Sequence, residues 1–112
     1  QPLVTETGEI ISEMIGRAAE DGDLFNHSLA RIVIPPKKSS KPHYHKNSQE
    51  TYYILQGEGT MDLDGEKFIL HPGTAITILP EETHCIENKG IVDLEFLAIC
   101  VPAWVPEDSF EV

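Results

Sequence analysis

The feature that most constrains the fold is a regular alternation, from about His27 onward, of short apolar runs and turn residues. Each run has the length of a β-strand and is rich in β-branched, aromatic or aliphatic residues. Asp64-Gly65 stands between two runs, which is typical of a tight hairpin. Short strands at intervals of about 8–12 residues predict an all-β sandwich or barrel. The runs are residues 28–34, 50–55, 60–63, 67–70, 75–79, 84–87 and 92–101.

The two ends of the chain follow different patterns. Apolar residues recur at helical spacing near the N-terminus, which predicts a short helix over residues 9–19. The last residues contain Pro102, Pro106 and three acids, which indicates a tail on the surface. We therefore expect an N-terminal segment of residues 1–26, a barrel of residues 27–101 and an acidic tail of residues 102–112, all within one domain. The residues at helical spacing are Ile10, Ile11, Met14, Ile15, Ala18 and Ala19.

The charge of the chain excludes several classes of partner. Asp and Glu outnumber Lys and Arg by 19 to 8, which gives a formal net charge of -11. Nucleic acids and anionic membranes are bound by clustered Lys and Arg, so we expect neither as a partner. No apolar run approaches the ~20 residues that a membrane-spanning helix needs. A chain of 112 residues is long enough to form one domain with its own core.

The cysteine count and the N-terminus indicate a reducing compartment. Cys85 and Cys100 are too few for a disulfide framework, so we expect both to be free thiols. The sequence shows no basic region followed by the apolar stretch of a signal peptide. We therefore expect a cytoplasmic protein.

Three of the five histidines fall in a pattern that suits metal binding. His43 and His45 flank one residue, so on a strand both imidazoles point to the same face. Glu50 follows at the start of the next strand, and His84 lies within a later one. Three imidazoles and a carboxylate suit Fe, Mn, Ni, Cu or Zn as divalent ions, and suit Ca or Mg poorly. Two histidines at this spacing are also common on strands that bind no metal.

The spacing of the whole region resembles the two sequence motifs of the cupin superfamily. The first motif is matched by His43, His45, Glu50 and Gly57, and the second by Gly73, His84 and Asn88 with Pro80 between them. The resemblance is closest to small single-domain cupins and covers most of the chain. It implies a double-stranded β-helix, also called a jelly-roll or cupin barrel, and often a homodimer. It also implies that His43, His45, Glu50 and His84 bind one divalent transition metal inside the barrel.

The chain departs from the motifs at three positions. Lys37 stands where the first motif usually has glycine, and Leu79 and Glu81 stand where the second usually has proline and glycine. These are turn positions, so the departures concern the local backbone more than the metal ligands.

The alternation of side chains along the strands places candidates around the metal. If Glu50 faces inward, Tyr52 does too, where its phenol could orient a substrate or move a proton, or could simply pack in the core. Phe96 lies on a strand with two apolar faces and is a candidate for the substrate-binding wall. Arg31 could bind a substrate carboxylate, or could pair with one of the many surface acids. The apolar outer face of the strand that contains Phe96 requires cover from the N-terminal helix or a second subunit.

Four protein ligands would leave about two open positions on a six-coordinate metal, enough for water, dioxygen or a chelating substrate. We therefore expect a metal-dependent enzyme that acts on a small oxygenated metabolite as a dioxygenase, a decarboxylase or lyase, or an isomerase. A barrel that binds a small ligand or a sugar without chemistry is the alternative, and a metal-scaffolded structural protein is a weaker one.

Overall fold

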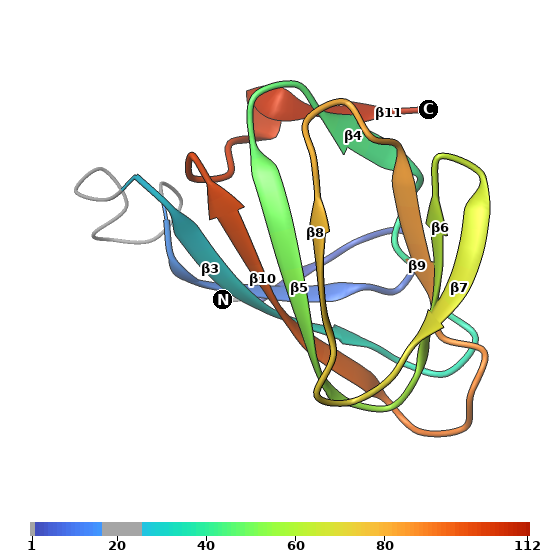
Figure 1. Cartoon of the computed structure of the whole chain (residues 1–112). Coiled ribbons are helices and arrows are strands. Elements are labelled where there is room, and N and C mark those ends of the chain that lie inside the picture. The colour runs from blue at the N-terminus through green and yellow to red at the C-terminus, as the bar shows by residue number, and fades with distance from the viewer. Residues whose placement is uncertain (1, 17–25) are drawn as a thin grey trace.

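The computed structural model describes residues 2–16 and 26–112. Its strands form two antiparallel sheets that face one another, with β3, β10 and β5 on one side of Figure 1 and β9, β6 and β7 on the other. This arrangement confirms the expected jelly-roll barrel. The six-stranded sheet has the order β1 (Leu3–Val4), β2 (Ile10–Ile15), β3 (Ser28–Ile34), β10 (Leu94–Val101), β5 (Gln49–Gln56) and β8 (Ala75–Ile78). The five-stranded sheet has the order β11 (Ser109–Glu111), β4 (His43–His45), β9 (His84–Glu87), β6 (Gly59–Leu63) and β7 (Glu66–Leu70).

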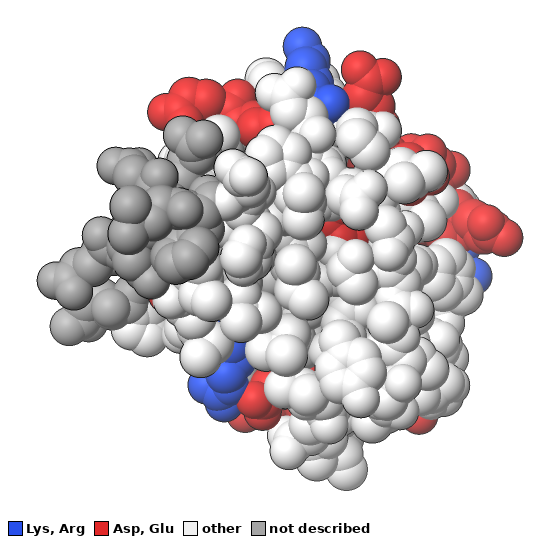
Figure 2. All heavy atoms as spheres, turned by 60° about the vertical axis from the view of Figure 1, so that its left-hand side comes forward, with Lys and Arg blue, Asp and Glu red and all other residues white. Residues whose placement is uncertain are grey.

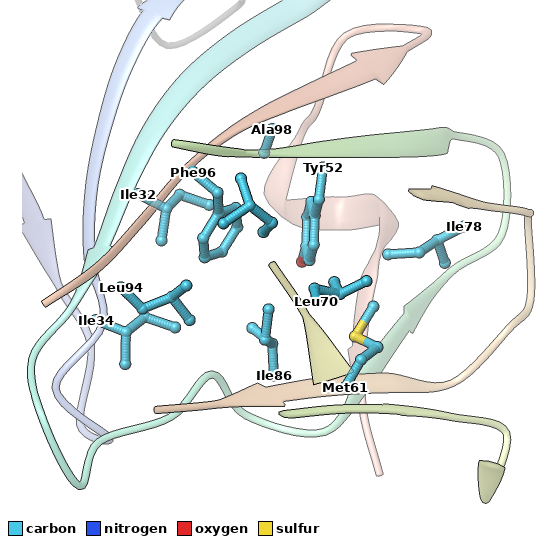
Figure 3. Close-up of a cluster of buried hydrophobic side chains, with 11 residues drawn as sticks. Ile32, Ile34, Tyr52, Met61, Leu70, Ile78, Ile86, Leu94, Phe96 and Ala98 are labelled. Carbon is cyan, nitrogen blue, oxygen red and sulfur yellow. The ribbon is translucent and has the colours of Figure 1, made fainter. Parts of the chain in front are cut away.

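Apolar side chains from both sheets fill the space between them (Figure 3). They come from alternate positions of each strand, because successive side chains of a strand point to opposite faces. On β10 this places Leu94, Phe96, Ala98 and Cys100 inside, as the sequence predicted. The core contains Ile32, Ile34, Tyr52, Ile54, Met61, Leu70, Ile78, Ile86, Leu94, Phe96 and Ala98.

The predicted N-terminal helix over residues 9–19 is wrong where the structure describes it. Residues 10–15 form β2, which pairs with β1 on one side and β3 on the other. The spacing of the apolar residues in this segment fits the period of a helix as well as that of a strand. Three of these residues are β-branched isoleucines, which favour strands. Pairing with the free edge of β3, for example Ile11 opposite Ile32, decides the outcome. Residues 17–19, the end of the expected helix, lie outside the described residues. Within the described ranges, no helix is long and apolar enough to cross a membrane.

The C-terminal residues add a strand to the barrel. A 3-10 helix, η2 (Pro106–Asp108), leads into β11, which pairs with β4 along its whole length. Asp108 is buried although it belongs to an acidic stretch of sequence. The chain end is therefore attached directly to the strand that contains His43 and His45.

At two of the three positions that depart from the cupin motifs, the backbone keeps the conformation that glycine favours. Lys37 has a φ of 70° and Glu81 a φ of 71°. Both values lie in the left-handed region, which costs a non-glycine residue some conformational energy. The turns therefore keep their shape without glycine.

Candidate metal centre

Both sheets contribute to the cluster of metal-ligating side chains. His43 and His45 lie on β4, and His84 lies opposite His43 on the neighbouring strand β9. Glu50 reaches the same point from β5 in the other sheet. One ligand atom from each of the four residues lies within 4.8 Å of the others. His45, Glu50 and His84 are buried and His43 is partly buried. The structure therefore brings together the four residues that the motifs predicted.

Each histidine of the cluster is held by a backbone carbonyl at its outer ring nitrogen. The Nδ1 atoms of His43, His45 and His84 lie 2.6, 3.1 and 3.1 Å from the carbonyl oxygens of Lys41, Asp108 and Glu82. A carbonyl only accepts hydrogen bonds, so each Nδ1 carries the proton and donates it. Each Nε2 then has a free lone pair, and a hydrogen bond of this kind is what orients metal-binding histidines.

The inner atoms of the cluster have no hydrogen-bond partner. His45 Nε2, His84 Nε2 and Glu50 Oε1 are buried and unsatisfied. Glu50 Oε1 lies 3.5 Å from His45 Nε2 and 3.3 Å from His84 Nε2, without hydrogen-bond geometry. Buried polar atoms without partners are unfavourable, and these are all electron-pair donors. A divalent transition metal at their centre would satisfy all of them, so the residues present fit such an ion.

The pKa values of His43 and Glu50 favour the protonation states that ligands need, whereas that of His45 does not. Burial, together with the nearby His84, lowers the pKa of His43 to about 4, so that this imidazole is neutral at neutral pH. Burial alone would raise the pKa of Glu50, but His45 and His84 lower it well below its usual range. Burial alone would lower the pKa of His45, but Glu50 raises it. Metal binding would therefore compete with a proton on His45.

A cavity of about 1000 Å³ opens onto this cluster. His43, His45, Glu50 and Tyr52 line it, together with apolar residues of β3 and β10 such as Ile32 and Ala98. The N-terminal strands β1 and β2 contribute another part of the wall. The cavity is large enough for a small metabolite, and both polar and apolar residues line it.

Tyr52 lies where the alternation of β5 predicted it. It is 2% exposed, and its ring packs against Phe96 at 4.5 Å and near His84 at 6.2 Å between ring centroids. Burial and the negative charge of Glu50 raise its pKa well above the usual value, so the phenol keeps its proton. The side chain is therefore a neutral hydroxyl group at the wall of the cavity.

The structure does not bring the two expected substrate-binding residues to the cavity. Phe96 is fully buried and packs behind Tyr52 in the core. Arg31 lies on the outer face of β3, because Ala30 and Ile32 on either side of it face inward. Its Nε donates to Glu95 at 2.6 Å, which is the surface pairing that the sequence left open. Among the described residues that line the cavity, Lys41 has the cationic side chain that Arg31 was expected to supply.

Sequence reasoning missed two acids that the structure places at the site. Asp108 positions His45 through its carbonyl, and its carboxylate accepts hydrogen bonds from the backbone N–H groups of residues 46–48. It is one of three acids in the tail, and no local pattern distinguishes it. Glu9 lines the cavity and is only 7% exposed, but it fell within the helix that the sequence predicted.

Comparisons with known proteins agree with this geometry. The family model described as "Cupin domain" matches residues 30–100. An uncharacterised protein of Methanocaldococcus jannaschii is 38% identical over 97% of this chain and 86% of its own length. An oxalate-binding protein of Thermotoga maritima is 40% identical over 65% of this chain, and the chain spans 60% of that protein.

A solved structure gives the same result at the level of the fold. The crystal structure of a predicted oxalate decarboxylase from Thermotoga maritima matches with a TM-score of 0.75 and 28% identity. The match covers 91% of this chain and 90% of that one. The barrel, the four converging ligand residues and the matched family model lead to one conclusion: the chain belongs to the cupin family.

Proposed function

We propose that this protein is a metal-dependent enzyme whose four ligand residues hold one divalent transition metal. The observation that carries the proposal is the set of three buried, unpartnered donor atoms at the centre of the cluster. The carbonyls that fix all three Nδ1 protons support it, because they leave each Nε2 ready to bind. The donor set is compatible with iron, manganese, nickel, zinc or copper. The ligands are His43, His45, Glu50 and His84.

The proposed substrate is a small carboxylic acid that presents two oxygens to the metal. Such a metal supplies Lewis acidity, which polarises a carbonyl group and stabilises negative charge on a substrate oxygen. Lys41 also lines the cavity, but its Nζ lies 3.5 Å from Glu6 and 3.3 Å from Glu111, so the proposed metal is the main attraction for an anionic ligand. The name of the Thermotoga relative, an oxalate-binding protein, supports the same class, since oxalate has two adjacent oxygens of this kind.

Among the three expected reaction classes, we place decarboxylase or lyase first, ahead of isomerase and dioxygenase. The support is the solved relative described as a predicted oxalate decarboxylase, at 28% identity. In this reading the neutral Tyr52 hydroxyl donates a hydrogen bond to the bound acid, while residues such as Ile32 and Ala98 provide apolar contacts at the cavity wall.

A non-catalytic ligand-binding cupin is the second candidate. It is favoured by the name of the oxalate-binding relative, which is 40% identical over the part matched. The enzyme and the binding protein would hold the same metal and the same ligand, and they differ only in whether the bound ligand is converted to a product.

One experiment separates the candidates. The protein is loaded with manganese, iron or zinc, oxalate binding is measured by calorimetry, and loss of oxalate and oxygen uptake are followed in the same samples. Metal-dependent loss of oxalate supports the enzyme, whereas metal-dependent binding with unchanged oxalate supports the binding protein. Absence of both binding and loss in a protein that holds metal contradicts the proposed substrate class.

We also propose a homodimer formed through the outer face of the six-stranded sheet. Tyr53, Leu55 and Val101 are more than 40% exposed on this face, and Leu97 and Ile99 are only half-buried between them. In Figure 2, where the side of β3 and β10 is turned forward, the surface is broadly uncharged. A chain of net charge -11 repels its own copies elsewhere, so the apolar part of this face, beside the mutually paired charges of Arg31 and Glu95, is where two copies meet at least cost.

The same charge supports our proposal that the partners are small molecules rather than nucleic acids or membranes. Both cysteines are free, which supports a reducing compartment such as the cytoplasm.

A further inference from the structure

Glu9 stands at the end of a short turn that joins β1 to β2 beside the cavity. Its N–H donates to Thr5 Oγ1 at 3.2 Å, and its carbonyl accepts from the N–H of Thr5 at 2.9 Å. Gly8 has a φ of 94°, and a Cβ there would lie 2.7 Å from the side chain of Lys38. These contacts fix the backbone of Glu9 and so the direction in which its side chain leaves the chain.

The side chain of Glu9 has no structural partner that would explain its burial. Glu9 is 7% exposed and lines the same cavity as His43, Glu50 and Tyr52. Within the described residues, no hydrogen bond or ion pair reaches its carboxyl group. Glu6, another acid at the cavity, differs because its side chain is 86% exposed and lies 3.5 Å from Lys41. Its carboxyl oxygens are not among the buried side-chain atoms that lack a partner, so they stay accessible from the cavity rather than enclosed in the core.

The surroundings of Glu9 make its carboxyl group a weaker acid than usual. Burial, with the negative charge of Glu50 added, raises the pKa of Glu9 to about 7. A metal on Glu50 would offset the second cause but not the larger one, so burial keeps the pKa of this carboxyl group raised toward neutral pH, as suits a general acid and base. The titratable groups that share this cavity with it include Glu6, Glu13, Lys41, His43, Glu50 and Tyr52.

We infer that Glu9 is a second catalytic residue, which exchanges a proton with a carbon of the bound acid next to its carbonyl group. The inference rests on the proposed function, because it needs a metal-dependent site that holds a small oxygenated acid. It adds a role that the four ligand residues cannot fill, since their donor atoms are directed at the metal. It also narrows the substrate to an acid that gains or loses hydrogen at carbon, such as a 2-oxo acid.

The step conserves atoms and charge. The C–H bond of the substrate breaks, its electron pair stays on the substrate as an enolate, and the proton passes to the carboxylate of Glu9. The protonated Glu9 exchanges its proton with solvent and then returns one to the same carbon. Loss of CO₂ from a 2-oxo acid with a second carboxyl group leaves the same enolate, which takes its proton from Glu9.

The test follows exchange of the methyl protons of pyruvate in D₂O by proton NMR, with manganese-loaded protein removed before each spectrum. Glu9→Gln keeps the size of the side chain and a hydrogen-bond donor but cannot transfer a proton. Glu66→Gln, at an exposed hairpin residue of the other sheet, is the matched control. Metal content and pyruvate binding are measured on every variant by elemental analysis and calorimetry.

We expect exchange in the wild type and in Glu66→Gln, and a loss of at least ~100-fold in Glu9→Gln. Metal content and pyruvate affinity of Glu9→Gln should stay within about twofold of the wild type, since Glu9 is not a ligand. Equal exchange in Glu9→Gln and the wild type, or a wild type that binds pyruvate without exchange, overturns the role of Glu9. A wild type that holds no metal, or that holds metal and binds neither pyruvate nor oxalate, instead overturns the proposed function.

Discussion

The backbone carbonyl of Asp108 accepts a hydrogen bond from Nδ1 of His45 at 3.1 Å, across 63 residues of sequence. The carboxylate of the same residue accepts the N–H groups of Lys46, Asn47 and Ser48, at 3.0 to 3.2 Å. One buried residue therefore fixes both the ring of a candidate metal ligand and the loop between β4 and β5. The C-terminal residues are in this way part of the candidate metal centre.

Asp108→Ala should lower the free energy of unfolding by about 2–3 kcal/mol, because buried N–H groups lose their acceptor. The same change should weaken metal binding by about tenfold at most, because the carbonyl that accepts from His45 remains and only the loop beside this histidine is less well held. Denaturant unfolding and metal titration measure the two effects. Glu107→Ala, a change at the exposed neighbour, is the control. Equal metal affinity in both variants would contradict the role of Asp108.

Glu9 should make the stability of the metal-free protein fall as the pH rises. Its pKa is about 7 in the fold, against 4.5 for an unperturbed glutamate. The native state therefore holds an extra proton between these pH values, and raising the pH through this window removes about 3 kcal/mol of stability. Glu9→Gln has no carboxyl proton to lose. The free energy of unfolding of this variant, relative to that of the wild type, should therefore grow by about 3 kcal/mol between pH 4.5 and pH 8. Urea unfolding at several pH values checks this, and a constant difference would show that Glu9 has an ordinary pKa.

Tyr52→Phe should show whether the hydroxyl group of Tyr52 takes part in catalysis or whether the side chain only packs in the core. The ring contacts with Phe96 and His84 remain, so stability should change by no more than about 1 kcal/mol. Turnover of oxalate should fall about 100-fold if the hydroxyl group acts on the substrate. Tyr53→Phe removes the same atom on the outer face of β5 and should have no effect on turnover. Full activity in Tyr52→Phe would assign this residue to packing alone.

A charge on the outer face of the six-stranded sheet should break the proposed dimer. Tyr53→Lys places a cation on that face, whereas Ile69→Lys places one at an exposed apolar residue of β7 in the other sheet. Burying an unpaired charge is costly, so Tyr53→Lys alone should shift the protein toward the monomer. Sedimentation equilibrium measures the mass in solution. A monomeric wild type, or a dimer that survives in Tyr53→Lys but not in Ile69→Lys, would contradict this interface.

The sequence was informative where a short-range pattern decides the structure. Alternation along β5 placed Tyr52 on the same face as Glu50, and both residues are buried in the structure. The motif spacing likewise identified four residues that converge. These predictions succeed because a strand has only two faces, so one inward residue determines the next.

The remaining features depend on contacts between distant parts of the chain. Residues 10–15 have apolar spacing that fits a helix, but the open edge of β3 makes them a strand. The contact of Asp108 with His45 depends on the pairing of β11 with β4, which no local pattern reveals. Glu9 reaches the cavity only because β2 forms. Arg31 was placed near a substrate from its residue type alone, and the inward direction of Ala30 and Ile32 turns it outward.

The metal content of the purified protein after dialysis tests the metal centre most directly. We expect elemental analysis to find about one equivalent of a divalent transition metal per chain in the wild type. The double variant His43→Ala/His45→Ala should hold almost none, whereas His71→Ala, at an exposed histidine outside the cluster, should hold as much as the wild type. Full metal content in the double variant would contradict the metal centre.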